Sequence, residues 1–377
     1  MSKLILGSLL VLGMTLIFTM PVLADDSQTK RVAITDKNLK DSYDVIHDFG
    51  DTFTAELTKK EIKELEKKGV KVEEVGMGQL LDPDKEGKDQ GKAKPPPVVC
   101  NPTAKTPWGI TKVNGGSGGK YNGSPVKVAV LDSGAATTHP DLKNNIVLCK
   151  DTTGRKIADG CSDTDGHGTH VAGTIAANGK ILGVAPDANL MIIKVCKPAG
   201  CYWDDLAEGI IYAADNGAKV ISISIGGTSG STIMENAVNY AQSKGILVVV
   251  AAGNSGPGAV TYPAAYAYPM SIGAIDSNEA IPSWSAVGTN DGDYVKEAGE
   301  VEMAAPGVSV QSTYKDGCYY TMSGTSMATP HVAGLAAKLW QGSASDTRTY
   351  LDNLAKNHDL DGAGDDKYSG FGLPIAP

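Results

Sequence analysis

Three short polar segments, far apart along the 377-residue chain, carry residue types that together perform nucleophilic catalysis. Asp132 ends an apolar run, His167 lies between two glycines, and Ser326 begins a Gly/Ala-rich stretch. A serine hydroxyl is a poor nucleophile at neutral pH, and a neutral imidazole is the base whose pKa suits that proton transfer. A carboxylate fixes the imidazole tautomer and stabilises the imidazolium. The segments therefore predict an Asp–His–Ser site that folding must assemble.

Each of these residues alone has a simpler structural explanation. An aspartate after a strand often caps the next turn, and a serine at a helix start is usually an N-cap. His170 and His331 are both expected inside helices and are interpreted as structural. His167 and His170 have a metal-ligand spacing, but the sequence offers no third ligand beside them. The hypothesis depends on the three segments occurring together and in order.

The elements that must position these residues alternate between strands and helices. Apolar runs predict strands at 126–131, 190–195, 220–225 and 246–252, and helices are expected at 167–177, 204–216, 233–243 and 326–340. Continuous apolar strands between helices are typical of a parallel sheet covered on both faces. We therefore expect an α/β fold, a three-layer α/β/α domain with a mainly parallel sheet whose carboxyl ends carry the functional groups. Pro330 is expected in the first turn of its helix, where a missing N–H costs least.

A charged front segment precedes this body. The chain has a net charge of -9, and residues 25–94 hold 17 acidic and 14 basic side chains. Strands are expected at 31–35 and 70–75 and a helix at 57–68, with Thr58 and Glu61 forming a capping box. This pattern predicts a small α+β domain. The Gly/Pro-rich, charged segment that follows is interpreted as an exposed linker.

The first 24 residues form a leader. Lys3 precedes a mostly apolar run at 4–20, and Val22-Leu23-Ala24 ends in a small residue of the kind that signal peptidases recognise. An uncleaved anchor is the alternative, because 17 residues is the lower limit for spanning a bilayer. We expect a removed signal peptide, hence a secreted protein with no stable membrane anchor.

The six cysteines agree with export. All lie after residue 95, and an even number in an exported chain favours disulfides over free thiols. No CxxC pair is present, which makes zinc ligation the weaker alternative. Local loop closure favours Cys149–Cys161 and Cys196–Cys201, which leaves Cys100–Cys318.

Longer motifs surround the three catalytic candidates and a fourth residue, Asn254. They read VAVLDSG, HGTHVAGT, AAGNSG and GTSMATPHVAG, and YSGFGLP follows at residues 368–374. Together they resemble the subtilisin-like serine proteases (subtilase family) from about Pro107 to the C-terminus. The resemblance implies Asp132 as the orienting acid, His167 as general base and then acid, and Ser326 as the nucleophile. It also implies that the Asn254 side chain and the Ser326 backbone N–H form the oxyanion hole.

The resemblance extends to substrate binding. Thr261 stands where the family often has glycine, so we expect Leu or Met rather than Phe or Tyr at the residue before the scissile bond (P1). An edge segment at 197–200, followed by Cys201 and Tyr202, would pair with the substrate backbone. The expected substrate-binding residues are Ser224, Ile225, Gly226, Gly227, Gly200 and Thr261.

The front segment resembles the family's propeptide, which acts as an intramolecular chaperone and inhibitor. The segment 72–81 resembles the propeptide tail that lies in the substrate cleft, so self-cleavage is expected after Leu81. The expected domains are a signal peptide at 1–24, a propeptide at 25–81, a linker at 82–106 and a catalytic domain at 107–377.

Metals and partners follow from the same resemblance. No cofactor is required for the chemistry, whereas family members often bind structural calcium. Asp141 resembles one calcium ligand, although the segment at 178–184 is shorter than the family's calcium loop. The acidic segment 359–366 lacks the Glu of an EF-hand and is interpreted as a solvated turn. The expected partners are polypeptide substrates and the chain's own propeptide. An acidic chain without a basic run argues against nucleic acid, and we expect a monomer.

Two other function classes remain as alternatives to a secreted, self-processing serine endopeptidase. A non-catalytic binding or inhibitory protein on the same scaffold would usually lack one of Asp132, His167 and Ser326, and all three are present. A lipase or esterase would need G-x-S-x-G, whereas position 328 is Ala, and its catalytic residues would follow another order.

Overall fold

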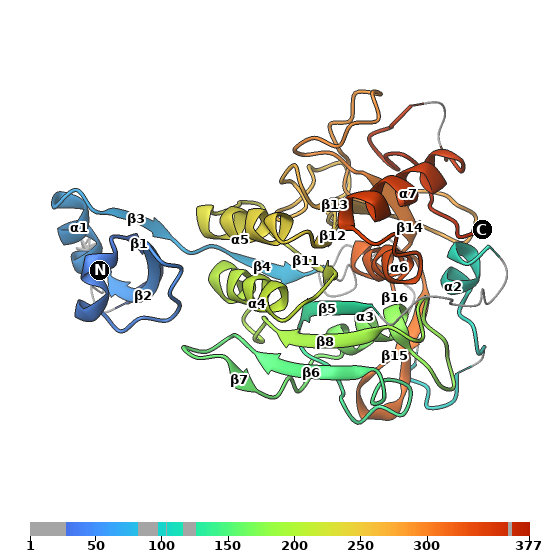
Figure 1. The fold of residues 1–377 in the computed structure, drawn as a ribbon, viewed down its shortest axis with the longest axis horizontal. Helices are drawn as coiled ribbons and strands as arrows, with labels where there is room; N and C mark the ends of the chain where they lie inside the picture. Colours follow the sequence, from blue (N-terminus) through green and yellow to red (C-terminus); the bar gives the residue numbers. More distant parts are fainter. Residues whose placement is uncertain (1–27, 82–96, 103, 116–125, 361–363) are drawn as a thin grey trace, which may run out of the picture.

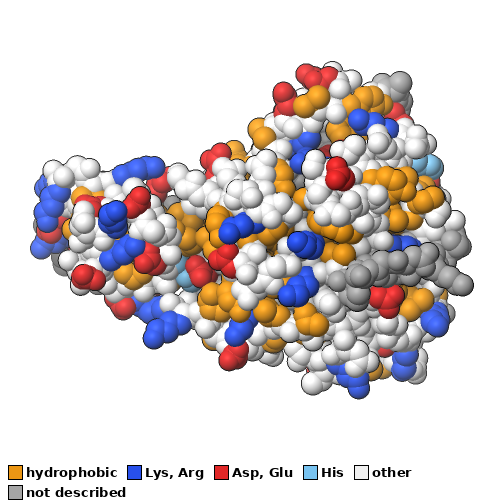
Figure 2. Space-filling view, in the orientation of Figure 1, with side chains coloured by type: hydrophobic (Ala, Val, Ile, Leu, Met, Phe, Trp, Pro, Cys, Tyr) orange, Lys and Arg blue, Asp and Glu red, His pale blue; other side chains and the backbone are white. Residues whose placement is uncertain are grey.

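A large α/β domain and a small α+β domain make up the molecule, joined by an extended segment that runs from the small domain into the large one (Figure 1). The computed structural model describes residues 28–81, 97–102, 104–115, 126–360 and 364–377. The expected signal peptide and most of the expected linker lie outside the described residues. Charged side chains are dense on the small domain and sparser on the face of the large one seen in Figure 2.

The large domain is built on one eight-stranded sheet in the order β14-β13-β12-β10-β5-β8-β6-β7. Every neighbouring pair is parallel except β6–β7, which is antiparallel. The sheet is therefore mainly parallel, as predicted. Its strands are β5 (Lys127–Asp132), β6 (Ile146–Asp151), β7 (Ala158–Asp159), β8 (Asn189–Lys194), β10 (Val220–Ile223), β12 (Leu247–Ala251), β13 (Met270–Ile275) and β14 (Met303–Pro306).

Alternate residues of the central strands divide the core into two halves. In β5, Val128 and Val130 pack with one buried cluster, and Ala129 and Leu131 pack with the other. The first cluster includes side chains of α2 (Trp108–Val113), α3 (His167–Ala176), α6 (Thr325–Lys338) and α7 (Ala344–Lys356). The second includes α4 (Trp203–Asp215) and α5 (Thr232–Ser243). Because successive strand residues point to opposite faces, this division confirms the three-layer α/β/α arrangement.

An antiparallel hairpin of β15 (Val310–Thr313) and β16 (Tyr319–Met322) lies outside the main sheet, with the short helix η2 (Lys315–Gly317) between its strands. Its first strand contacts α3, where the Ser312 and Thr313 hydroxyls donate to the carbonyls of His170 and Thr169. The hairpin thus braces the histidine-bearing helix from outside the sheet.

The small domain has a three-stranded antiparallel sheet in the order β2-β1-β3 and two short helices. These are β1 (Thr29–Thr35), η1 (Lys37–Ser42), β2 (Thr52–Thr58), α1 (Lys59–Lys67) and β3 (Lys71–Glu74). The capping box is confirmed, since Glu61 N donates to Thr58 Oγ1 and Thr58 N donates to Glu61 Oε2. Val32, Ile34 and Phe53 belong to its own small core, whereas Ala33 packs with the α4–α5 side of the large domain.

The end of the small domain becomes a strand of the large one. Strand β4 (Met77–Leu80) pairs on one side with β11 (Ile225–Gly226) and on the other with β9 (Cys201–Tyr202), both antiparallel. In Figure 1 it runs from the small domain past α4 and α5 to β11. The strand predicted at 220–225 is therefore two strands, because Ser224 separates β10 from β11.

All three expected disulfides are present, Cys100–Cys318, Cys149–Cys161 and Cys196–Cys201. The first links the segment ahead of the catalytic domain to the β15–β16 hairpin. Within the described residues, no helix is long and apolar enough to cross a membrane.

Candidate active site

Asp132 and His167 meet at the carboxyl end of β5. His167 Nδ1 lies 2.9 Å from Asp132 Oδ1 and 3.0 Å from Oδ2, and both side chains are fully buried. Ser133 N also donates to Asp132 Oδ1 at 2.7 Å. A carboxylate facing Nδ1 keeps the proton on that nitrogen, so the neutral ring presents its lone pair at Nε2. The pair therefore has the geometry of an oriented general base.

Asp163, a buried carboxylate that sequence reasoning missed, connects the loop after β5 to the start of α3 and so holds Asp132 and His167 in place. Its Oδ1 accepts from Ser133 Oγ at 2.9 Å and from Gly166 N at 2.8 Å, and its Oδ2 accepts from Thr169 N at 2.9 Å. Burial opposes ionisation, but the Gly166, Thr169 and Ser133 donors hold the pKa of Asp163 below its usual value. The only signal for Asp163 in the sequence was its place shortly before Gly166, the N-cap of α3.

Close backbone approach explains the glycine that follows His167. A Cβ on Gly168 would lie 2.2 Å from Gly134 O and 3.1 Å from Asp132 Oδ1. Only glycine therefore lets the start of α3 come this close to the loop after β5. This close approach places the His167 imidazole within hydrogen-bond distance of the Asp132 carboxylate.

Ser326 is the second residue of α6, next to a buried amide. Its Oγ donates to Ser224 O at 3.1 Å. Asn254 Oδ1 accepts from Thr325 N and Thr325 Oγ1, both at 3.0 Å, which fixes the orientation of the amide. Asn254 Nδ2 is buried and has no hydrogen-bond partner among the described residues. An unpaired buried donor costs free energy, so its presence beside a candidate nucleophile indicates a binding position for a developing oxyanion.

Pro330 lies in the interior of α6, not in its first turn, so that prediction was wrong. The helix begins at Thr325, with Gly324 rather than Ser326 at the N-cap position. A proline has no N–H, so the carbonyl four residues earlier, that of Ser326, loses its usual helical donor. Ser224 Oγ supplies the replacement and donates to Ser326 O at 3.0 Å. Ser224 and Ser326 are thus joined by two reciprocal hydrogen bonds.

The β4 segment ends beside these serines. Leu81 N donates at 3.3 Å to Ser224 O, the same carbonyl that accepts the Ser326 hydroxyl. The Leu81 side chain is buried, and a Cβ on Gly226 would lie 2.9 Å from its Cδ1 and 2.4 Å from Thr261 Oγ1. The structure therefore brings Gly226 and Thr261 close to the Leu81 side chain and Ser224 to the Leu81 backbone amide.

The remaining expected substrate-binding residues lie along the same segment. Ile225 pairs with Leu80, and Gly227 approaches Met77 O, where a Cβ would lie at 3.1 Å. Gly200 borders a cavity of about 420 Å³ beside the tail. Its lining residues are Gln79, Leu80, Ser133, Thr164, Asp165, Lys194, Cys196, Lys197, Pro198, Gly200 and Cys201. The pairing partner is β9 at Cys201–Tyr202, just after the edge segment predicted at 197–200.

Asp141 does not fit the calcium position expected for it. The carboxylate is buried, its Oδ1 accepts from Lys180 N at 3.0 Å, and its Oδ2 accepts from Ile181 N at 3.0 Å and Tyr319 Oη at 2.8 Å. Three donors already satisfy this charge, and donor hydrogens would face any cation placed there. The short segment after α3 brings its backbone amides to Asp141, where a metal-binding loop would present oxygen ligands.

A second acidic group lies elsewhere on the large domain. Asp291, Asp293 and Asp365 each place a carboxylate oxygen within 4.8 Å of the others. Asp365 is buried and accepts from Asn290 Nδ2 and Tyr294 N, both at 3.0 Å. The interpretation of 359–366 as a wholly solvated turn was therefore wrong for Asp365, because these two donors hold it inside.

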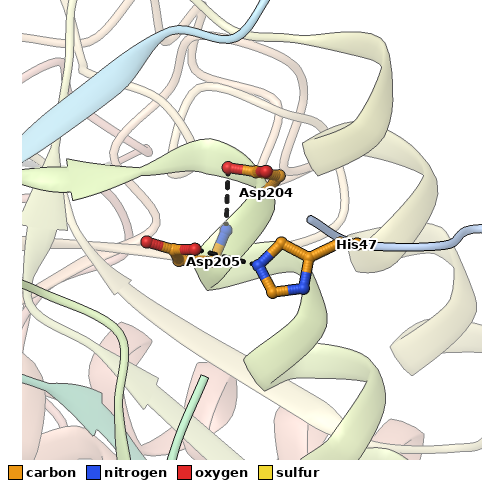
Figure 3. Close-up of side chains that lie close together, drawn as sticks. All are labelled: His47, Asp204 and Asp205. Atoms are coloured by element: carbon orange, nitrogen blue, oxygen red, sulfur yellow. Dashed lines mark hydrogen bonds and ion pairs between the residues drawn. The ribbon is translucent and has the colours of Figure 1, made fainter. Parts of the chain in front are cut away.

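A third cluster, drawn in Figure 3, joins the two domains. His47 of the small domain places Nε2 2.9 Å from Asp205 Oδ1, and Arg31 reaches Asp204 Oδ2 at 2.8 Å and Asp205 Oδ1 at 2.6 Å. Burial raises the pKa of the Asp204 carboxyl, and the Arg31 guanidinium opposes that rise. The arginine supplies the positive charge between these carboxylates, so the cluster is an interdomain ion-pair network rather than a metal site.

The other two histidines near the site are structural, as interpreted. His170 Nε2 donates to Val310 O at 3.0 Å, and burial lowers its pKa to about 3. His331 Nδ1 donates to Met327 O at 2.8 Å, and burial lowers its pKa to about 4. Both rings remain neutral inside the domain at physiological pH.

Comparisons with known proteins identify the family. The model of the subtilase family matches residues 123–372. The chain is 39% identical to a subtilisin of Bacillus sp. (strain TA39), over 93% of this chain and 90% of the relative, and 44% identical to subtilisin Savinase of Lederbergia lenta, over 67% and 90%. Among solved structures it resembles sphericase (TM-score 0.69) and the S41 psychrophilic protease (TM-score 0.68), each 42% identical and covering 73% of this chain and 99% of the other. The chain belongs to the subtilase family and is a serine endopeptidase.

Proposed function

We propose that this chain is a secreted endopeptidase that cuts itself after Leu81 and then hydrolyses polypeptides through Asp132, His167 and Ser326. The observation that carries the proposal is the double role of Ser224 O, which accepts both the Ser326 hydroxyl and the Leu81 amide. One carbonyl thus ties the candidate nucleophile to the residue whose peptide bond would be cut.

Each step of the chemistry has a residue suited to it. The Ser326 Oγ attacks the scissile carbonyl while His167 Nε2 takes its proton, and Asp132 stabilises the resulting imidazolium. Asn254 Nδ2 and Ser326 N donate to the oxyanion at the positive end of α6. His167 then protonates the leaving amine, and water, activated by the same imidazole, releases the acyl group. No cofactor takes part.

Thr261 makes the P1 pocket suited to leucine. Its Oγ1 and the Leu81 methyl groups both crowd the position of a Gly226 Cβ. An aromatic P1 side chain is larger than leucine, so we expect Leu and Met to be preferred to Phe and Tyr there. Strand pairing with β9 and β11 would bind the backbone of a substrate and would place few requirements on its side chains outside P1.

The small domain would act as the inhibitory propeptide until it is removed. Its tail fills the cleft as β4, and Arg31 and His47 hold its body to α4 through Asp204 and Asp205. Secretion rests on the leader at residues 1–24 and agrees with three disulfides, which persist in oxidising compartments.

The test uses the chain purified after export from an expressing cell. We expect a mature N-terminus at Asp82 or within the following linker, and turnover of a leucine-P1 peptide amide that a serine-reactive phosphonate abolishes. Faster turnover of the matched tyrosine-P1 peptide would contradict the pocket assignment. A mature N-terminus far from Asp82, or turnover that survives the phosphonate, would overturn the proposal.

A further inference from the structure

Strand β9 would lose its partner when the small domain is removed. In the order β11-β4-β9, the one described strand beside β9 is β4, which pairs Gly78 with Cys201 and Met77 with Tyr202. The Arg31 guanidinium of the small domain also lies over the Tyr202 ring, 4.6 Å from its centroid. A strand of two residues without a partner has no hydrogen-bond ladder to keep it extended. The empty cleft therefore has an edge that its own sheet does not hold.

Besides the main chain, one covalent link holds this strand, the disulfide between Cys201 and Cys196. Cys196 lies two residues beyond the end of β8, an interior strand of the eight-stranded sheet. Between them, Val195 N donates to Asp132 O at 2.9 Å. The disulfide thus ties the edge of the cleft to the sheet at the point where the sheet carries the candidate catalytic aspartate.

The turn that this disulfide closes is short and faces solvent. Lys197 and Gly200 exchange two backbone hydrogen bonds of 3.0 Å, and residues 197–199 are exposed. Both cysteine side chains are buried, and both line the cavity of about 420 Å³ beside the β4 tail. A loop closed by a disulfide has few conformations to lose, so it can present β9 in its pairing conformation before a substrate arrives.

We propose that the Cys196–Cys201 disulfide is a positioning element that keeps β9 extended in the empty cleft and so prepares it to pair with a polypeptide backbone. The inference rests on the proposed function and gives a role in substrate binding to a disulfide that no catalytic step uses. Without it, each substrate must order the edge as it binds, so KM should rise by about tenfold. The value of kcat should stay within about twofold, because the bound complex is the same.

Reduction by a dithiol should have the same effect on the processed enzyme. One thiolate of the dithiol attacks a sulfur of the disulfide and forms a mixed disulfide, and its second thiolate then closes the oxidised ring. Cys196 and Cys201 gain two electrons and two protons and become thiols. Coupling between binding and oxidation is reciprocal, so a bound peptide of the tail sequence 72–81 should make the pair about tenfold harder to reduce at equilibrium.

The first test compares the processed wild type with the double variant Cys196→Ser, Cys201→Ser on a leucine-P1 peptide amide. We expect KM to rise by about tenfold and kcat to change by less than about twofold. The tethered tail is present at a high effective concentration, so the variant should still cut itself. The matched control is Cys100→Ser, Cys318→Ser, which removes a disulfide that does not line the cavity and should leave KM unchanged.

The second test needs no variant, so it serves if the double variant does not fold. The processed wild type is equilibrated with a dithiol buffer, and free thiols are alkylated and located by peptide mass mapping. We expect KM to rise in step with alkylation of Cys196 and Cys201, and the 72–81 peptide to lower the ratio of reduced to oxidised pair by about tenfold. Where the double variant is available, the same buffer should leave its KM unchanged, which excludes the other two disulfides as the cause.

The results separate the role of the disulfide from the proposed function. An unchanged KM after reduction of the Cys196–Cys201 pair would overturn the positioning role and leave the proposed function intact. A loss carried by kcat would also overturn it, because the disulfide would then act on the chemical step. A rise in KM that Cys100→Ser, Cys318→Ser reproduces would show a general loss of stability instead. Failure of the unreduced wild type to cleave the peptide would contradict the proposed function itself.

Discussion

Asp132 and Asp141 are both buried, and only a short loop separates them, yet they hold different kinds of partner. Asp132 binds one backbone amide and the imidazole of His167. Asp141 binds two backbone amides and the Tyr319 hydroxyl. The first carboxylate orients a ring that can exchange protons, whereas the second clamps the loop after α3. Burial of a carboxylate is therefore no sign of catalysis, and the partner decides its role.

The comparison extends to the other groups of the candidate active site. The Asn254 Nδ2 donor is buried with no partner among the described residues, and the Ser326 hydroxyl donates to Ser224 O, the carbonyl that the tail shares. Around Asp141 each carboxylate oxygen is matched to a donor. Substitutions in the candidate active site should therefore abolish activity and leave stability unchanged. Substitutions around Asp141 should lower stability and leave the catalytic residues intact.

His167→Ala should give the largest effect in the region of Asp132. Removing the base leaves the Ser326 proton with no acceptor, and we expect kcat to fall by about 10⁶-fold, the size known when the corresponding residue of a subtilisin is removed. The rate constant for self-cleavage after Leu81, followed by intact mass spectrometry, measures this loss, because a chain that is not cut keeps its inhibitory tail in place. The thermal midpoint should change little. A loss of less than about tenfold would contradict the catalytic role of His167.

Asn254→Ala should give a smaller loss in the same region. It removes one of two oxyanion donors, so kcat should fall by about 10²–10³-fold while KM stays close to the wild-type value, as for the oxyanion asparagine known in this family. A fall in kcat/KM carried mainly by KM would instead assign Asn254 to substrate binding.

Asp141→Ala should act on stability alone. It leaves the Lys180 and Ile181 amides and the Tyr319 hydroxyl without an acceptor, at a cost of about 2–3 kcal/mol in the free energy of unfolding. Denaturation in the Ser326→Ala background, which prevents self-digestion, measures the loss. The exposed Asp159→Ala is the matched control and should leave the midpoint unchanged. If a calcium chelator abolished the difference between Asp141→Ala and its parent, the assignment of Asp141 as metal-free would be wrong.

Acid should weaken the fold through the buried neutral histidines. The pKa values of His170 and His331 are about 3 and about 4, below the ordinary 6.5, because burial disfavours their charged forms. Between pH 6.5 and about 4 the unfolded chain binds protons that the native chain excludes, so the free energy of unfolding falls as pH falls. Each histidine contributes a slope of about 1.4 kcal/mol per pH unit.

Urea denaturation of the Ser326→Ala chain across this pH window measures the slope. His331→Gln cannot titrate there and should reduce it by about the contribution of one histidine. An unchanged slope would show that His331 is charged or accessible in the native state.

Much of the fold could be predicted because its signals are local. The apolar strands of the central sheet, the Thr58–Glu61 capping box and the disulfide pairs all came from residues close in sequence or from simple elimination. The catalytic candidates came from residue types in order, and the structure brings Asp132 to His167 and Asn254 to the start of α6.

The rest depends on long-range contacts that no local pattern contains. The Ser224 hydroxyl donates to the Ser326 carbonyl in place of the N–H that Pro330 lacks, although Ser224 and Pro330 are far apart in the sequence. No local pattern shows this replacement, and the proline was therefore wrongly placed in the first turn. Asp163 was missed because its donors come from both sides of the β5–α3 junction. The resemblance alone made Asp141 a candidate calcium ligand, because only folding reveals that backbone amides donate to its oxygens.

The central claim is that Ser326 attacks the bond after Leu81 within its own chain, and intact mass spectrometry of two forms tests it most directly. The wild-type chain should be recovered without residues 25–81 attached, whereas Ser326→Ala should retain them uncut. A Ser326→Ala chain that is still cut after Leu81, when produced in a host without other secreted proteases, would contradict the account.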